Sequence, residues 1–549
     1  MKKRVKVLLA TLLTAAMALT MAGCGSMRKD GYYATTTDTM YAPANSPNYS
    51  VSRTPSPGMT VDSEMDAQMD EGMDGEMAQK EFNTEEYSSI EENRPMKVSM
   101  SPLSTFSIDV DTASYSNIRR FIENGIRPPA DAVRIEEMIN YFTYDLPQPD
   151  GEVPFSVTTE LGKCPWNEDN YLAMIALQGK SVKNEDLPKS NLVFLFDVSG
   201  SMDSPDKLPL LKSSFQLLVE QLGENDRVSI VVYAGASGVV LDSARGDEKE
   251  EILEALNGLY AGGSTAGGEG IKLAYKIAKK NYISGGNNRV ILATDGDFNV
   301  GVSSEGELVR LIEKKRKEGV FLSVLGFGTG NIKDNKMEAL ADKGDGNYAY
   351  IDSLLEAKKV LVNEMGGTLL TIAKDVKIQV EFNPAKVKEY RLVGYDNRML
   401  RNEDFDDDTK DAGEIGAGHS VTAFYEIVPY KAGEEIESPQ LKYQSAEVRQ
   451  EWENEWMEVR LRYKKPDSDI SQKLVQTVTS SEIRENPSEN FVFASAVAEL
   501  GLLLKDSQYK GASSFDNVMK RAESSIGRDA ENYRSNFLEL VGKAKRVMD

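Results

Sequence analysis

This sequence of 549 residues contains only one histidine, His419, and only two cysteines. With a single histidine, a multi-histidine zinc site cannot be assembled, and a Ser-His-Asp triad would have to be built on His419, which lies in a Gly-Ala-Gly-His turn-like segment. Positive charge is also in deficit: 64 lysines and arginines face 87 acidic residues, and the net charge is −23. A polyphosphate or anionic lipid surface would repel such a chain. The composition therefore argues against nucleic acid as a partner and fits a well-solvated surface protein.

After the N-terminus no apolar run approaches the length of a membrane span, so membrane attachment must depend on the first residues. Residues 1–6 are mostly basic, and the short apolar segment 7–21 leads to Ala22, Gly23 and Cys24. This order is typical of an export signal. Small residues before a cysteine resemble the bacterial lipoprotein box, which implies cleavage before Cys24 and diacylglycerol on its sulfur. The alternatives are an ordinary secretory signal and an uncleaved anchor.

A lipid on Cys24 would place the protein outside the cytoplasm, attached to a bacterial membrane by that lipid alone. It would also leave Cys164 without a partner, so the exported fold must be held by its core rather than by a disulfide. Residues 25–96 are rich in Ser, Thr, Pro, Met, Asp and Glu and lack apolar periodicity. Because such a segment cannot bury enough surface to offset its ordering entropy, we expect a disordered, acidic and polar tether.

Residues 187–371 alternate between strand and helix periods. Buried strands are predicted at residues 192–196, 227–233, 288–294 and 320–326, and helices at 207–222, 270–282, 305–317 and 354–365. Repeated alternation of this kind implies an α/β fold with a doubly wound, mostly parallel sheet and helices on both faces.

Three loops of this region carry oxygen-bearing side chains at the same predicted edge of the sheet. Asp197, Ser199 and Ser201 follow the first strand, Thr265 lies in a glycine-rich loop, and Asp295 ends another strand. Open α/β sheets bind ligands at the carboxyl ends of their strands, and Mg²⁺ and Mn²⁺ prefer hard oxygen ligands. Together the three loops resemble the metal-ion-dependent adhesion site of the von Willebrand factor type A (VWA) domain.

The resemblance implies that Ser199, Ser201 and Thr265 ligate the metal directly, while Asp197 and Asp295 bind it directly or through water. The ion would be Mg²⁺, Mn²⁺ or Ca²⁺, and in the family a protein partner adds an Asp or Glu carboxylate. The charges of these residues are consistent with such a site. Two carboxylates neutralise a divalent ion and the hydroxyls add no charge, so the metal keeps electrophilic character and favours a further anionic oxygen ligand. The alternative is that the hydroxyls only cap turns and helix starts.

On both sides of the VWA-like region the hydrophobic period changes to two, which predicts half-buried antiparallel strands. The flanks cover residues 97–186 and 372–465, and a helical region follows at 466–549. The simplest arrangement is one β-sandwich built from both flanks, with the central domain as an insertion. Four segments resemble the regions that bracket the A domain in a family of bacterial envelope lipoproteins: residues 106–115, 134–142, 391–395 and 413–419.

The sequence thus predicts a cell-envelope lipoprotein that binds a protein partner through a metal-dependent adhesion site, and not an enzyme. The first alternative is a metal-assisted hydrolase of the envelope, which would need a general base beside the metal, a role open to Asp203 or Asp297. The second alternative is an envelope scaffold whose metal site is structural.

Overall fold

The computed structural model describes residues 84–108, 111–183, 186–264, 267–296, 305–436 and 452–548. The predicted signal segment with Cys24, and also Thr265 and Asp297, lie outside these described residues. The chain divides into one unit at Met1–Ala78 and a second at Gln79–Asp549, which is the one described below. Within the described part, no helix combines the length and apolar character needed to cross a membrane.

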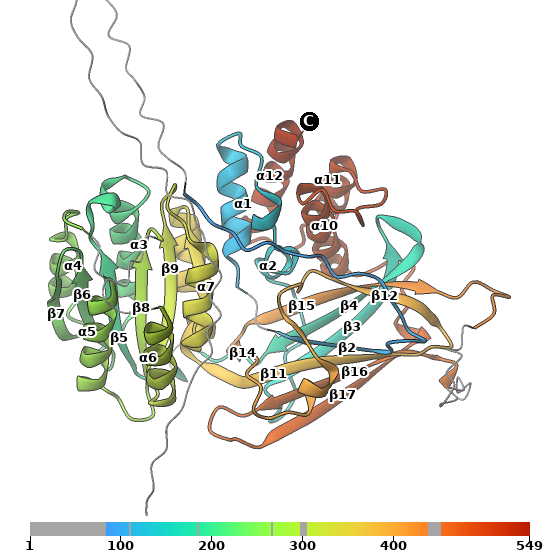
Figure 1. Ribbon diagram of the computed structural model, residues 1–549, viewed down its shortest axis with the longest axis horizontal. Coiled ribbons are helices and arrows are strands. Elements are labelled where there is room, and N and C mark those ends of the chain that lie inside the picture. Colours follow the sequence, from blue (N-terminus) through green and yellow to red (C-terminus); the bar gives the residue numbers. More distant parts are fainter. Residues whose placement is uncertain are drawn as a thin grey trace, which may run out of the picture. The chain divides into compact units, whose positions relative to one another are not determined.

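The central region folds around a six-stranded sheet with the order β10-β9-β8-β5-β6-β7 (Figure 1). Neighbouring strands run parallel from β10 to β6, and β7 pairs antiparallel with β6 at the edge. This arrangement confirms the predicted α/β fold class. The strands are β5 (Ser190–Asp197), β6 (Arg227–Tyr233), β7 (Ser237–Arg245), β8 (Asn287–Thr294), β9 (Phe321–Phe327) and β10 (Tyr348–Ile351).

Helices cover both faces of this sheet, since every residue of β5 is buried. Phe194 and Phe196 contact Phe215 of α3 on one face, at ring-centroid distances of 4.8 and 4.6 Å. Val193 and Leu195 join the core on the other face, beneath α5, α6 and α7. The helices are α3 (Leu208–Gln221), α4 (Lys249–Asn257), α5 (Gly267–Lys280), α6 (Glu305–Lys317), α7 (Asp334–Lys343), α8 (Leu354–Lys358) and α9 (Met365–Leu369).

The helix predicted over residues 354–365 begins where expected, but it changes to a π-helical turn at Lys359–Asn363, and α9 begins after a turn at Glu364. Lys359 is buried in this turn, where its ammonium pairs with Glu364 at 2.5 Å and lies 4.3 Å from the centre of the Tyr141 ring. Hydrophobic periodicity does not predict the contact between Lys359 and Tyr141, because the two residues are far apart in the sequence.

Strands from both flanks form the two antiparallel sheets of a sandwich (Figure 1). One sheet has the order β1-β12-β15-β4-β3, and the other has the order β13-β2-β11-β16-β17 with β14 paired to β11. Inward-facing side chains of both sheets share one core. The strands are β1 (Met96–Lys97), β2 (Leu103–Ser107), β3 (Phe155–Cys164), β4 (Asn167–Gly179), β11 (Thr371–Phe382), β12 (Val387–Val393), β13 (Met399–Leu400), β14 (Gly413–Gly416), β15 (Ser420–Pro429), β16 (Glu455–Lys464) and β17 (Ser471–Thr479).

Five further helices pack against the sheet that contains β4 and β15. Leu172 and Met174 of β4 and Phe424 of β15 belong to this helical core, so the sheet is covered on both faces. The helices are α1 (Ala113–Glu123), α2 (Ile135–Asn140), α10 (Glu489–Leu504), α11 (Phe515–Glu523) and α12 (Tyr533–Met548).

Residues 84–95, which composition assigns to the tether, pack against the folded unit instead. The amides of Thr84 and Glu86 donate to two carbonyl oxygens in the loop after β9, at 2.8 and 2.9 Å. Glu85 accepts two hydrogen bonds of 2.9 Å from the Arg120 guanidinium. Backbone pairing and ion pairs need no apolar side chains, so hydrophobic periodicity does not report them. We call residues 84–87 the N-terminal strap.

Buried ion pairs join the central region to the flanking helices. Arg134, directly before α2, contacts Glu338 and Asp334 of α7 at 2.6 and 3.2 Å. Arg119 of α1 pairs with Asp352 and Glu356 at the end of β10 and in α8. The central region is therefore docked through desolvated charges on the β10 side of its sheet.

Candidate metal centre

Asp197 ends the central strand β5, and its carboxylate is fully buried. Its Oδ1 accepts a 2.9 Å hydrogen bond from the Ser199 amide. Its Oδ2 accepts bonds of 3.1 and 3.2 Å from the hydroxyls of Tyr233 and Thr294. Tyr233 ends β6 and Thr294 ends β8, the two strands beside β5. The sheet thus fixes this carboxylate with neutral donors from both of its neighbours.

The two predicted serine ligands lie together just beyond β5. The hydroxyl oxygens of Ser199 and Ser201 are 3.1 Å apart, and Ser199 is buried whereas Ser201 is exposed. Two backbone hydrogen bonds of 2.8 and 3.0 Å fasten residues 198–200 to residues 262–263 of the glycine-rich loop. Thr265 belongs to that loop in sequence but lies outside the described residues.

Asp295 follows β8, and its side chain is also fully buried. Its Oδ2 accepts a 2.9 Å hydrogen bond from the Lys207 ammonium and a 3.3 Å bond from the Asn331 side-chain amide. Lys207 directly precedes α3, and Asn331 lies in the loop after β9. Asp295 and Asp197 therefore share the carboxyl edge of the sheet, and they differ in the charge of their hydrogen-bond donors.

Electrostatics at this edge favour cation binding. Burial raises the pKa of Asp197 to about 6, and the negative charge of Asp295 acts in the same direction. Hydrogen bonds from Ser199 and Tyr233 stabilise the ionised form and oppose that rise. Asp197 is consequently ionised at neutral pH although it is buried, and a buried charge calls for a counter-ion.

Sequence reasoning missed four side chains that complete the centre: Lys207, Tyr233, Thr294 and Asn331. Tyr233 and Thr294 are the last residues of their strands, so the rule that parallel strand ends meet would have found them. Lys207 and Asn331 come from segments whose approach depends on tertiary packing, and the sequence carries no local signal for it.

The donor set fits a hard divalent cation. It offers the carboxylates of Asp197 and Asp295 and the hydroxyls of Ser199 and Ser201, with neither sulfur nor imidazole among these ligands. Oxygen-only sets of this kind suit Mg²⁺, Mn²⁺ or Ca²⁺ and disfavour softer metals.

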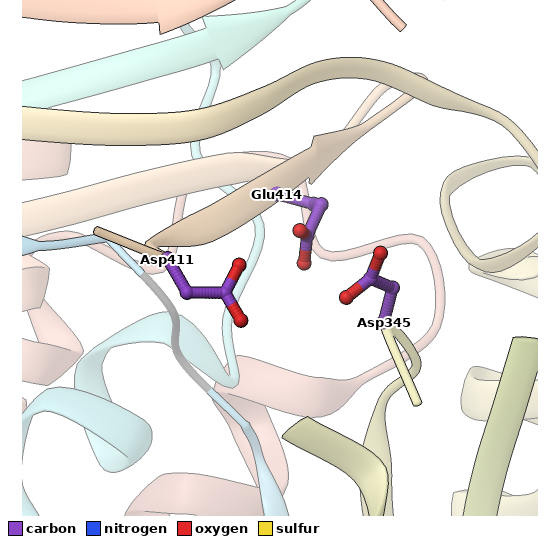
Figure 2. Close-up of side chains that lie close together, drawn as sticks. All are labelled: Asp345, Asp411 and Glu414. Carbon is purple, nitrogen blue, oxygen red and sulfur yellow. The ribbon is translucent and has the colours of Figure 1, made fainter. Parts of the chain in front are cut away.

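A second acidic cluster lies at the opposite, amino-terminal edge of β10 (Figure 2). Carboxylate oxygens of Asp345, Asp411 and Glu414 lie within 4.8 Å of one another. The Arg316 guanidinium contacts both Asp345 and Asp411, at 2.6 and 2.8 Å. Because this guanidinium joins Asp345 of the central region to Asp411 of the flank that carries β14, we interpret the cluster as an ion-paired contact between the two regions.

Comparison with known proteins assigns the chain to a family. Residues 191–363 match the family model of the von Willebrand factor type A domain, residues 367–547 a model described as the C-terminal region of uncharacterized protein YfbK, and residues 81–174 a model described as von Willebrand factor. Uncharacterized protein YfbK of Escherichia coli (strain K12) is 44% identical over 477 residues, which cover 85% of this chain and 82% of YfbK. The chain belongs to the YfbK family. Its VWA domain indicates a protein-interaction or adhesion function.

Two further similarities are more limited. Uncharacterized protein sll0103 of Synechocystis sp. is 30% identical over 186 residues, which cover 33% of this chain and 42% of that protein. A solved structure of von Willebrand factor type A from Catenulispora acidiphila is 16% identical, covers 73% of this chain and 91% of that chain, and has a TM-score of 0.40. The predicted VWA domain is confirmed by its family model, and the lipoprotein part of the sequence resemblance stays a prediction.

Proposed function

We propose that this YfbK-family protein captures a protein partner through a divalent metal in its VWA domain, on the outer side of a bacterial membrane to which Cys24 is lipid-anchored. Asp197, Ser199, Ser201 and Asp295 would hold the ion together with Thr265. The observation that carries the proposal is the buried Asp197 carboxylate, which neutral donors fix beside the two serine hydroxyls. Buried charges in proteins are paired or coordinate metals, and oxygen ligands of this kind favour the second.

When bound, the metal would supply an electrophile that accepts a carboxylate oxygen from an Asp or Glu of the partner. The chain's own residues prepare the site for it. Tyr233 and Thr294 hold Oδ2 of Asp197 and the Ser199 amide holds Oδ1, so the carboxylate has little freedom left to lose when a cation arrives.

Exposed side chains mark the surface that a partner would meet around the centre. Tyr260 is 83% exposed and lies two residues before Gly262, whose amide donates to the Val198 carbonyl at 2.8 Å. Val239 of the edge strand β7 is 42% exposed. Exposed aromatic side chains are frequent anchors of protein interfaces, so Tyr260 is the first contact we expect beyond the metal.

Catalysis forms no part of the proposal. Of the two candidate general bases, Asp203 is exposed on the turn that follows Ser201, and Asp297 lies outside the described residues. A structural metal in an envelope scaffold is the competing function that the experiment must separate from partner binding.

The experiment compares the double variant Asp197→Ala/Ser199→Ala with wild type and with Ser213→Ala, a matched control whose hydroxyl lies on an exposed part of α3. Isothermal titration with Mn²⁺ should give binding for wild type and control and none for the double variant. Both altered residues lie at a strand end rather than in its apolar body, so unfolding free energy should change by no more than ~1–2 kcal/mol.

Partner capture is then measured by cross-linking in envelope extract, with Mg²⁺ or with chelator. The same cross-linked partner should disappear both with chelator and with the double variant. Undiminished capture by the folded double variant would show that the partner binds elsewhere. Loss of folding in that variant would show that the site is structural and would favour the scaffold.

A further inference from the structure

Lys207 places a positive charge inside the candidate metal centre. Its ammonium lies 2.9 Å from Oδ2 of Asp295, and the two side chains are 8% and 0% exposed. Lys207 does not belong to the metal-site pattern of the sequence, because it lies six residues beyond Ser201 and directly before α3. The contact is therefore an addition to the predicted set of oxygen ligands.

The surrounding structure accommodates this lysine specifically. The loop after β9 passes its aliphatic stem at Gly328, where φ is +75° and a Cβ atom would lie 2.3 Å from Cγ of Lys207. Glycine is the residue that tolerates both this backbone conformation and this close approach. Asn331 of the same loop donates to the same Oδ2 of Asp295 at 3.3 Å. One carboxylate oxygen is thus occupied by donors from two separate elements.

We propose that Lys207 is a positioning residue that sets the charge of the centre and so makes an anionic partner ligand necessary. The inference rests on the proposed function. Asp197 and Asp295 alone would cancel the charge of a divalent ion, whereas with the Lys207 ammonium the loaded centre carries a net charge of about +1. The lysine also competes with the metal for the charge of Asp295.

Two opposite consequences follow for binding. Repulsion between ammonium and metal weakens the affinity for the metal alone. The same positive charge strengthens the attraction of the loaded centre for a monoanionic oxygen ligand such as a carboxylate. Lys207 therefore makes metal binding weaker and binding of the partner's carboxylate to the loaded centre stronger. It favours partners that present Asp or Glu over partners that present a neutral oxygen.

The test replaces the charge and keeps most of the stem. Lys207→Met in the full chain is titrated with Mn²⁺ in the absence of any partner, and its Kd should be at least tenfold lower than that of wild type. Acetate is then added to the Mn²⁺-loaded proteins as a carboxylate probe, with water-proton relaxation as the readout, and the variant should bind acetate several-fold more weakly. Asn331→Ala removes the neutral donor from the same oxygen and should change the Mn²⁺ Kd less than threefold.

Lys207→Gln serves as a second variant that keeps a hydrogen-bond donor and loses only the charge, and it should change both affinities in the same direction as Lys207→Met. If wild type binds Mn²⁺ and the two neutral variants bind it equally well or more weakly, this inference is overturned. The proposed metal site would then still stand. If only the neutral variants bind Mn²⁺, the lysine acts as inferred but the proposed function of the native chain fails. Absence of Mn²⁺ binding in all of these proteins would overturn both.

Discussion

Arg134 offers a sharp test of how the VWA domain is held by the flanks. Its guanidinium contacts Glu338 and Asp334 of α7 at 2.6 and 3.2 Å and Glu137 of α2 at 3.5 Å. The arginine side chain is 3% exposed and the three carboxylates are at most 10% exposed. Removal of one partner from a buried ion pair costs about 3–5 kcal/mol, because the remaining charge is left without compensation. Arg398 also contacts Glu338, at 2.7 Å, so we expect Arg134→Met to cost about 3 kcal/mol at pH 8.

The cost should depend on pH in a defined direction. Burial raises the pKa of Asp334 to about 6, although Arg134 opposes that rise, and burial also raises the pKa of Glu137. An acid whose pKa is higher in the folded state takes up a proton on folding, so its ionisation above that pKa destabilises the fold. Loss of Arg134 raises these pKa values further. The penalty should therefore grow as the pH rises through about 6, where Asp334 ionises, and should be smaller at pH 5.5 than at pH 8.

Urea denaturation with two probes locates the effect. Trp166, Trp452 and Trp456 all lie in the flanks, so tryptophan fluorescence reports the flanks, whereas far-ultraviolet circular dichroism reports both regions. The two transitions should coincide in wild type and separate in Arg134→Met. Arg401→Met is the matched control, because Arg401 and Glu403 are 72% and 71% exposed and such pairs contribute about 0–1 kcal/mol. A loss below about 1 kcal/mol at pH 8, or an equal loss at both pH values, would refute the reasoning.

Three further predictions concern the strap, the domain junction and the anchor. Glu85→Gln weakens the pairing with Arg120 and should speed protease cleavage near residues 84–95, while Glu91→Gln, at a side chain that is 78% exposed, should not. Gly367→Ala places a Cβ atom 2.2 Å from the His419 ring and should lower the unfolding free energy by about 1–3 kcal/mol in urea titrations, whereas Gly433→Ala, with open space around that position but a φ of +83°, should cost less. Cys24→Ala should move the protein from the detergent phase to the aqueous phase, and equal recovery with the membrane fraction would contradict the lipid anchor.

The sequence predicts the VWA sheet well because its strands are buried on both faces. In β5 and β8 every residue is buried, and each strand contains an apolar stretch, residues 192–196 and 290–293, that ends in a polar side chain. Asp197 and Asp295 follow from this pattern, since parallel strands bring their carboxyl ends to one edge. Lys207 does not follow from it, because its approach to Asp295 depends on where the loop with Gly328 passes.

Hydrophobic periodicity also fails where polar groups make the contacts. Thr84 and Glu86 pair with the loop after β9 through their backbone amides, and Glu85 pairs with Arg120 through its carboxylate. Because these contacts need no apolar side chains, the segment has the composition of a tether although it is packed. Lys359 lies in the π-helical turn between α8 and α9, where its ammonium contacts Glu364 and the Tyr141 ring. The partners of the strap and the Tyr141 ring beside Lys359 are distant in sequence, and a local pattern cannot report such contacts.

The order of the strands separates the ion pairs that dock the VWA domain from its candidate metal centre. Arg119, Arg134 and the N-terminal strap contact segments that follow β9 and β10, at one side of the sheet. The candidate centre lies at the ends of β5 and β8, but its Asn331 comes from the loop after β9 that also pairs with the strap. Strands β6 and β7 continue the sheet away from the docked side. Val239 of β7 is exposed on that other side, and Tyr260 is exposed two residues before Gly262, which bonds to Val198 after β5. We expect a partner that approaches the candidate centre from the β6 and β7 side to leave the ion pairs of Arg119 and Arg134 intact, whereas a partner that displaces Asn331 would also disturb the strap.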